Sequence, residues 1–139
     1  MASMRSIPSL SIVIPCLNEA KRLPFLLADL SRWPQPLDLW IVDGGSSDCT
    51  VLIGEVYGAK IINSKETNRG YQLKCGAEKS TGSWLLFLHA DSRLTKDWAS
   101  FLYKIISEST SKSHAWYFDF RLLKQGGLIY LLERLVAIR

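Results

Sequence analysis

The chain has 139 residues, of which 47% are hydrophobic and 22% charged, and these proportions are typical of one compact globular domain. Its net charge of +4 is spread along the chain without a long basic run, so charge gives no indication of a nucleic-acid-binding protein. The three cysteines include no CxxC pair, which argues against a disulfide framework and a zinc site. No apolar stretch reaches the roughly 18 residues of a membrane span and no signal peptide is recognisable, so we expect a cytoplasmic protein.

The N-terminal third of the chain predicts a strand, a helix and a second strand. Residues 10–14 (LSIVI) form a short, β-branched apolar run that is typical of a buried strand. Across 19–33 the leucines recur at helical spacing, and Pro24 is compatible with a helix only in its first turn. Two further prolines end this helix, and residues 37–42 (LDLWIV) predict the second strand.

The same alternation continues to the end of the chain. Ser47 or Asp48 can cap a helix that runs to about Tyr57, and Thr95 can cap another that runs to about Glu108. Residues 83–88 (SWLLFL) are apolar enough to predict a strand covered on both faces of the sheet. The other predicted elements are strands at 59–63 and 115–123 and helices at 71–79 and 128–136.

Short apolar strands that alternate with helices predict an α/β fold. We expect one Rossmann-like domain over residues 1–139, with a mostly parallel sheet and helices on both faces. In such sheets ligands bind beyond the carboxyl ends of the strands. Polar clusters follow three of the predicted strands, at 15–19 (PCLNE), 43–48 (DGGSSD) and 89–92 (HADS). Because parallel strands share a direction, we expect these clusters to meet at one edge of the sheet.

Asp91 is the most informative residue of these clusters. It follows the apolar run WLLFL directly, so we expect its carboxylate to face a crevice with apolar walls. Burial there disfavours the charged form unless a cation compensates it, and oxygen ligands suit Mg²⁺ or Mn²⁺. The alternative is that Asp91 only caps a turn through a hydrogen bond to the backbone.

Two other segments have features of a ligand site. The turn at Gly44 lets the backbone approach a ligand closely, because glycine has no Cβ atom. Residues 68–72 (NRGYQ) open a helix, where an arginine and exposed amides favour a phosphate or the polar edge of a base. A plain strand-to-helix turn and a solvated loop are the respective alternatives. Neither GxGxxG nor GxxxxGK[ST] occurs, so a dinucleotide fingerprint and a P-loop are both absent.

Taken together, the segments SIVIPCLNEA, IVDGGSSDCT and NRGYQLKCGAEKSTGSWLLFLHADS resemble the family 2 glycosyltransferases, which have the GT-A fold. The resemblance is clear over residues 9–98 and looser over 115–139. VDGGSSD and LHAD are most similar to the small bacterial branch that is associated with radical-SAM and selenoprotein-type domains.

The resemblance implies a metal-assisted transfer of a sugar from a UDP- or GDP-linked donor to an acceptor hydroxyl, with Mn²⁺ or Mg²⁺ on the diphosphate. By position in the family motifs, the nucleotide pocket is lined by Pro15, Asn18 and Glu19, and the residues near base and ribose are Asp43 and Gly44. The segment that closes over the nucleotide contains Arg69, Gly70 and Gln72, and the acid that holds the metal is Asp91.

The sequence departs from the family pattern at two motif positions. Gly44 replaces the second acid of the family's VDDGS turn, which weighs against UDP without excluding it. His89 replaces the first acid of the DxD motif and leaves Asp91 as the chief metal ligand, although a neutral imidazole can also bind a metal. Family members are generally longer, and their second half carries the acceptor site and the catalytic base. The acids Asp119 and Glu133 match no family motif, so the base is unassigned.

Two other functions remain as alternatives. A nucleotidyltransferase would usually carry a glycine-rich loop after the first strand, and PCLNEAKR contains no glycine. A truncated or non-catalytic module that binds nucleotide sugar is the second alternative. The last segment, LIYLLERLVAIR, can lie on a membrane surface or pack on its own domain, and an exposed apolar stripe there would favour homo-oligomers.

Overall fold

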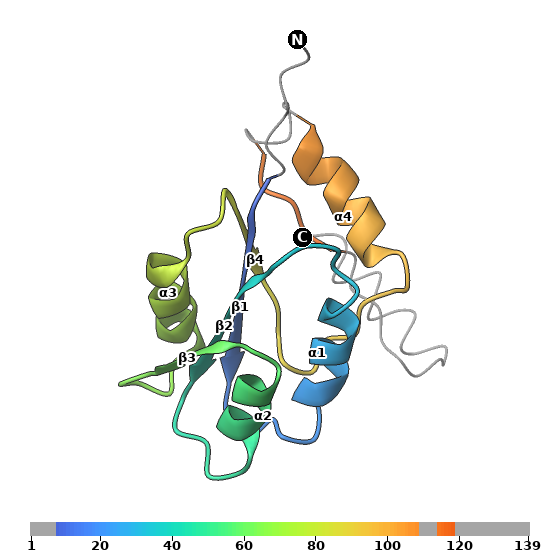
Figure 1. Ribbon diagram of the computed structural model, residues 1–139. Helices are drawn as coiled ribbons and strands as arrows, with labels where there is room; N and C mark the ends of the chain where they lie inside the picture. The colour runs from blue at the N-terminus through green and yellow to red at the C-terminus, as the bar shows by residue number, and fades with distance from the viewer. Residues whose placement is uncertain (1–7, 109–113, 119–139) are drawn as a thin grey trace, which may run out of the picture. The chain divides into compact units, whose positions relative to one another are not determined.

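The computed structural model describes residues 8–108 and 114–118 (Figure 1). The helices and strands of this described part all lie in the first of two structural units, Met1–Ser109. Residues 114–118 belong to the second unit, and they form neither helix nor strand. None of the helices in the described ranges is long and apolar enough to cross a membrane.

The described residues form a four-stranded sheet whose strands are all parallel, in the order β3-β2-β1-β4 (Figure 1). A helix follows each strand, so the predicted α/β alternation and the parallel sheet are confirmed. The elements are β1 (Leu10–Cys16), α1 (Leu23–Leu30), β2 (Asp38–Asp43), α2 (Thr50–Val56), β3 (Lys60–Asn63), α3 (Arg69–Lys79), β4 (Trp84–Phe87) and α4 (Trp98–Ser107).

The helices cover both faces of the sheet, as predicted. On one face α3 packs against β1 and β2, where Gly76 lies so close to Val13 that no Cβ atom fits between them. On the other face Ile12, Ile14 and their neighbours form the main core with residues of α1 and α4. Figure 1 shows α3 on the opposite side of the sheet from α1, α2 and α4. Strict alternation along β1 therefore divides its side chains between two apolar layers.

The prediction that residues 83–88 are covered on both faces is wrong. Trp84 and Leu86 face the main core, but Leu85 and Phe87 remain 38% and 46% exposed on the face that α3 covers elsewhere. The physical reason is position in the sheet. Within the described residues β4 is an edge strand, and α3 packs over β1 and β2 instead.

Most helix boundaries differ from the predicted ones by a few residues. The first helix begins at Leu23, which places Pro24 in its first turn as the sequence requires. The N-cap of α2 is Cys49, and the predicted cap Asp48 instead accepts a hydrogen bond from the amide of Thr50. Thr95 is not the cap of α4, because that helix begins three residues later, after Asp97.

Some predicted elements fall on the C-terminal part of the chain. Residues 115–118 of the predicted strand 115–123 are not in a strand, and 119–123 lie outside the described residues. The predicted helix 128–136 lies outside them as well, with the interpretations of that segment as a membrane-surface or packing helix. Asp119 and Glu133 also lie outside the described residues.

Candidate functional site

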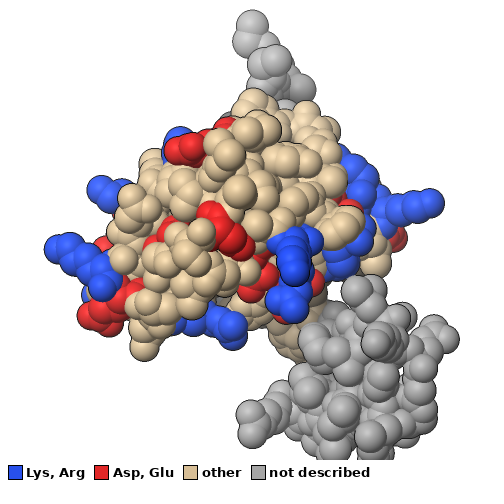
Figure 2. All heavy atoms as spheres, turned by 90° about the horizontal axis from the view of Figure 1, so that it is seen from below, with Lys and Arg blue, Asp and Glu red and all other residues tan. Residues whose placement is uncertain are grey.

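The loops that follow β1 and β2 meet at the carboxyl edge of the sheet, which confirms the prediction for two of the three polar clusters. Cys16 and Asp43 are paired as the last residues of their strands, and the amide of Gly44 donates to the carbonyl of Cys16 at 2.8 Å. Figure 2 shows the molecule from this side, where acidic and basic side chains lie beside one another. The polar clusters of the first two motifs therefore form one continuous surface.

Asp43 builds the turn that follows β2. The residue is only 4% exposed, and its Oδ2 atom accepts hydrogen bonds from the amides of Gly45 at 3.0 Å and Ser46 at 2.9 Å. The hydroxyl of Ser46 donates to the Oδ1 atom. Gly45 has a φ of 97°, a conformation that side-chain-bearing residues rarely adopt. The motif DGGS thus specifies a tight turn around a buried carboxylate.

Asn18 ties the loop after β1 to this turn. It adopts a left-handed conformation with φ 53°, which asparagine tolerates better than most residues. Its side-chain Oδ1 atom accepts a hydrogen bond from the backbone amide of Ser47 at 2.8 Å, and its backbone amide donates to the hydroxyl of Ser46 at 2.8 Å. The next residue, Glu19, donates its amide to the hydroxyl of Thr50 at 2.8 Å and pairs with Arg22 at 3.5 Å.

Gln72 joins the carboxyl ends of β1 and β2 from the face of the sheet that α3 covers. Its Nε2 atom donates to the carbonyls of Cys16 at 3.0 Å and Val42 at 2.7 Å, and the residue is only 4% exposed. A Cβ atom at Gly44 would lie 3.2 Å from this Nε2 atom. Gln72 therefore holds the carboxyl ends of β1 and β2 together, and Gly44 leaves the room that it needs.

The other predicted binding residues differ in exposure. Arg69 and Gly70 are exposed in the first turn of α3, whose N-cap Asn68 accepts a hydrogen bond from the amide of Tyr71 at 3.1 Å. Pro15 is buried in β1, in register with Val42. The first turn of α3 therefore presents a cation at the surface, whereas Pro15 belongs to the interior.

The environment of Asp91 differs from the one that the sequence predicted. The prediction of a buried carboxylate in an apolar crevice is wrong, because Asp91 is exposed while its neighbours Leu88 and Ala90 are buried. The turn here is closed by the amide of Ser92, which donates to the carbonyl of His89 at 3.0 Å. Asp91 does not cap the turn, since its carboxylate makes no hydrogen bond or ion pair within the described residues.

The two aspartates of the DGGSSD turn are already engaged in hydrogen bonds within the protein. Hydrogen bonds from the hydroxyl and amide of Thr50 and from the amide of Ala20 lower the pKa of Asp48. Burial raises the pKa of the Cys16 thiol to about 12, and the charges of Glu19, Asp43 and Asp48 add to this effect. The thiol of Cys16 is therefore protonated near neutral pH and is not a nucleophile.

In the part of the chain that the structure describes, no three His, Cys, Asp or Glu side chains are grouped to hold a metal ion. Asp91 nevertheless fits the role of a single protein ligand, since its oxygens have no other partner among residues 8–108 and 114–118 and it lies in the loop after β4. A Mg²⁺ or Mn²⁺ ion commonly takes one or two carboxylates and completes its coordination with substrate phosphates and water.

Sequence reasoning missed two residues that shape this region. The hydroxyl of Thr67 donates to the carbonyl of Gly44 at 2.8 Å and ties the approach to α3 to the DGGS turn. Asp29 is buried in α1 and holds the segment that follows Asp91. A signal for Asp29 was present, because it lies on the same helical stripe as the buried Leu26 and Leu30, where a charge requires partners.

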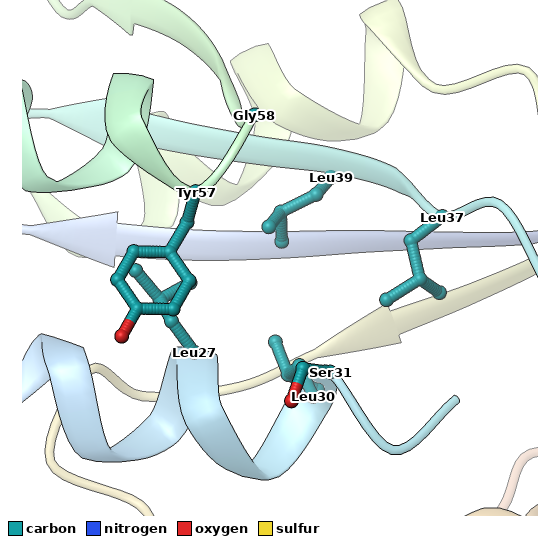
Figure 3. A pocket seen from close by; sticks show the side chains of 7 residues that line it. All are labelled: Leu27, Leu30, Ser31, Leu37, Leu39, Tyr57 and Gly58. Atoms are coloured by element: carbon teal, nitrogen blue, oxygen red, sulfur yellow. The ribbon is translucent and has the colours of Figure 1, made fainter. Parts of the chain in front are cut away.

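A separate apolar cavity of about 170 Å³ lies between α1, β2 and the end of α2 (Figure 3). Its lining includes Leu27, Leu39 and Tyr57 but no acidic or basic side chain. It also lies along the first half of β2, away from Asp43 and the other strand ends. A cavity without a cationic group does not suit a phosphorylated ligand, so we do not assign it to the candidate site.

Comparison with known proteins adds the decisive observation. The family model described as "Glycosyl transferase family 2" matches residues 11–113, which run from the second residue of β1 past the end of α4 and include the three polar clusters. The chain belongs to this family.

Named relatives of this family 2 chain are glycosyltransferases. The PGL/p-HBAD biosynthesis glycosyltransferase of Mycobacterium bovis (strain BCG / Pasteur 1173P2) is 38% identical over 94 residues, which cover 63% of this chain and 37% of that protein. The 4,4'-diaponeurosporenoate glycosyltransferase of Staphylococcus haemolyticus is 35% identical over 98 residues, which cover 66% of this chain and 26% of that protein. The chain thus spans well under half of the length of both relatives.

Solved structures confirm the fold of the family 2 chain. TarS of S. aureus matches with a TM-score of 0.65 at 22% identity, over 70% of this chain and 32% of that one. The mannosyltransferase PcManGT from Pyrobaculum calidifontis, in complex with GDP-Man and Mn²⁺, matches with a TM-score of 0.62 at 19% identity, over 72% of this chain and 32% of that one. The GT-A assignment made from the sequence is therefore confirmed.

Proposed function

We propose that this chain binds a nucleotide sugar at the carboxyl edge of its sheet and serves the transfer of the sugar to an acceptor hydroxyl. The observation that carries the proposal is the free carboxylate of Asp91. Of the other motif carboxylates, Asp43 and Asp48 are occupied by hydrogen bonds that build their own turns, and Glu19 pairs with Arg22. Asp91, in contrast, is exposed and has no partner within the described residues.

Asp91 is the residue that would hold a divalent cation, Mn²⁺ or Mg²⁺, together with the diphosphate of the donor. Such a cation neutralises negative charge on the leaving diphosphate. The metal complexes of relatives in fold support this choice, since PcManGT was solved with GDP-Man and Mn²⁺. The exposed His89 lies two residues before Asp91 and offers a nitrogen for the same cation or for a sugar hydroxyl.

The nucleotide would lie across the loops after β1 and β2 and the start of α3. Arg69 is exposed in the first turn of α3 and offers a cation to a phosphate, and Gly70 beside it leaves the backbone accessible. Asn18 and Glu19 fix the two loops to each other, and Asp43 holds the turn after β2 in shape below this surface.

Gln72 and Pro15 would contribute from inside the domain. The amide of Gln72 holds the backbone of Cys16 and Val42, so it supports the nucleotide surface from below.

Gly44 presents a backbone without a side chain where the family usually carries an acid, so we take both UDP and GDP as donor nucleotides to be tested. The acceptor and the catalytic base are not assigned to residues of the described part.

The test is a binding titration with UDP and with GDP, each with and without Mn²⁺, on the unaltered chain and on Asp91→Asn. We expect Mn²⁺ to tighten binding of one nucleotide at least tenfold, and Asp91→Asn to remove this gain. Glu55→Gln is the matched control, because it removes one exposed carboxylate on α2. Equal binding with and without Mn²⁺, or full Mn²⁺ dependence in Asp91→Asn, would refute the proposal.

A transfer assay separates the alternatives. Release of the nucleotide from a UDP- or GDP-sugar that depends on Asp91 is expected of a glycosyltransferase. Metal-dependent binding without turnover would instead identify a nucleotide-sugar-binding module. Incorporation of a nucleoside monophosphate into product would identify a nucleotidyltransferase.

The finer assignments made from the sequence stay predictions. They are the single domain over 1–139, the cytoplasmic location, and the branch associated with radical-SAM and selenoprotein-type domains, whose name none of the relatives given above carries. Contact with a membrane surface and homo-oligomer formation depend on the last helix of the sequence, which lies outside the described residues.

A further inference from the structure

The segment that follows Asp91 is attached to the last turn of α1 by one buried carboxylate. The Oδ2 atom of Asp29 accepts a hydrogen bond from Arg93 Nε at 2.8 Å and another from the amide of Leu94 at 3.0 Å. Asp29 is only 3% exposed, although Asp91, two residues before Arg93, is exposed. The loop that carries the free carboxylate therefore has a fixed point immediately after it.

Further contacts make this attachment rigid. Arg32 pairs with Asp29 Oδ1 at 3.1 Å and donates to the carbonyls of Leu94 and Thr95, both at 3.2 Å. The indole nitrogen of Trp98 donates to the backbone carbonyl of Asp29 at 2.8 Å. The guanidinium group of Arg93 lies 5.4 Å from the centre of the Phe25 ring, which restricts its orientation.

The loop is also fixed before Asp91. The amide of Leu88 donates to the carbonyl of Val13 at 3.1 Å, and Leu88 and Ala90 are buried, at 7% and 3% exposure. Asp91 is therefore exposed, without a partner in the described part of the chain, and lies between two anchored points of the backbone. A ligand that is held in place before its metal arrives loses less conformational entropy on binding.

Asp29 carries its charge in the folded protein. Burial acts to raise its pKa, but the hydrogen bonds from Arg93 and Leu94 and the charge of Arg93 outweigh this effect and lower it. Two arginines therefore face a carboxylate and not a neutral acid, and the bonds to Arg93 and Leu94 are charge-assisted.

We propose that Asp29 and Arg93 form a positioning pair that fixes the 88–95 loop and so prepares the Asp91 carboxylate for the cation of a metal–nucleoside diphosphate complex. This inference rests on the proposed function. Asp29 and Arg93 are positioning residues, since they act through the backbone on Asp91. A purely structural role for the pair would change the stability of the domain but not the Mn²⁺ concentration that Asp91 requires.

The test uses Arg93→Gln, which removes a cation but leaves Asp29 with Arg32 and the amide of Leu94. Asp29→Asn is the second variant, and it keeps a side-chain oxygen as acceptor. The control is Asp38→Asn, because Asp38 is likewise an aspartate bonded to a cation and to a backbone amide, those of Lys60 at 2.9 Å and Thr81 at 3.0 Å. Asp38 lies at the amino end of β2, whereas Asp91 follows the carboxyl end of β4.

Two measurements are made on each full-length variant, well below its melting temperature. Hydrogen–deuterium exchange of the peptide 88–95 in metal-free protein is expected to speed up in both loop variants and not in Asp38→Asn. The Mn²⁺ concentration for half-maximal binding of UDP or GDP is expected to rise about tenfold in the loop variants, with metal-free nucleotide affinity unchanged. Asp38→Asn is expected to lower only the melting temperature.

The outcomes separate this inference from the proposed function. Unchanged exchange of 88–95 in Arg93→Gln, or an unchanged Mn²⁺ requirement, overturns the positioning role while Asp91 keeps its own. An equal rise of the Mn²⁺ requirement in Asp38→Asn also overturns it, because the effect then follows stability. Absence of Mn²⁺-dependent binding in the unaltered chain overturns the proposed function and this inference with it.

Discussion

The contact between α3 and β1 gives the sharpest test of the packing. Gly76 of α3 lies over Val13, and a Cβ atom added to Gly76 would stand 2.3 Å from Val13 Cγ1 and 2.9 Å from Val13 Cγ2. Carbon atoms in contact prefer about 3.5–4.0 Å, so Gly76→Ala forces the helix and the strand apart by about 1 Å. We expect Gly76→Ala to destabilise the domain even though alanine favours helix.

The magnitude follows from two opposing effects. Extra carbon in a well-packed core costs about 1–3 kcal/mol, and the upper part of this range applies because Val13 has both γ-carbons in the way and a central strand holds its backbone. Replacing glycine by alanine inside a helix gains about 1 kcal/mol. The net loss is then about 1–2 kcal/mol, which lowers the melting temperature of a domain of about 100 residues by about 4 °C or more.

Thermal unfolding followed by circular dichroism measures this loss. A double-mutant cycle with Val13→Ala isolates the contact, because that substitution removes both obstructing γ-carbons. The double variant is expected to lose less unfolding free energy than the sum of the losses in the two single variants. Gly54→Ala is a useful comparison, since its Cβ atom would meet the flexible end of Ile41, at 2.5 Å. A melting temperature of Gly76→Ala equal to or above that of the unaltered chain would refute the reasoning.

Two further predictions use titration and reactivity. The pKa of Asp29 is lowered from its usual 3.8, so its stabilising effect is fully present above about pH 3.8 and is lost as the pH falls through the lower folded-state value. The melting-temperature difference between the unaltered chain and Asp29→Asn should therefore be largest near pH 6 and shrink below pH 4, and a difference that grows in acid would contradict this sign. The Cys16 thiol, with a pKa of about 12 and a buried position, should resist iodoacetamide at pH 8 while the exposed Cys49 reacts. Mass spectrometry of the labelled, folded protein checks this, and equal labelling of both cysteines would show that the strand ends open.

The parallel sheet was predictable because its signals are local. The apolar runs at 10–14 and 37–42 are short and β-branched, and each is followed by a polar segment with turn residues. Parallel strands have all their carboxyl ends at one edge, so the order of elements predicts that the loops after Cys16 and Asp43 lie at the same edge, and the structure adds the register that pairs these two residues. The hydrogen bond between the Asn18 side chain and the amide of Ser47 forms because both loops lie at this edge, and no separate sequence motif predicts it.

The exposure of β4 was not predictable from its own composition. Leu85 and Phe87 are as apolar as the buried residues of β1, and the pattern of WLLFL is the same for a central and an edge strand. What decides their burial is the place of α3, which packs on β1 and β2 through the small residue Gly76. Composition reports what a strand can bury, whereas topology decides what it does bury.

The environment of Asp91 was missed for a related reason. Its preceding apolar run ends at a buried Leu88, but alternation between buried and exposed residues continues through Ala90, so the carboxylate comes out at the surface. The fixed position of the loop depends on Asp29, which is 64 and 65 residues away in sequence from Arg93 and Leu94. A single sequence shows Asp29 only as a charge on an apolar helical stripe. The structure supplies its partners, and the partners link a residue of the core to the residue that we expect to meet the metal.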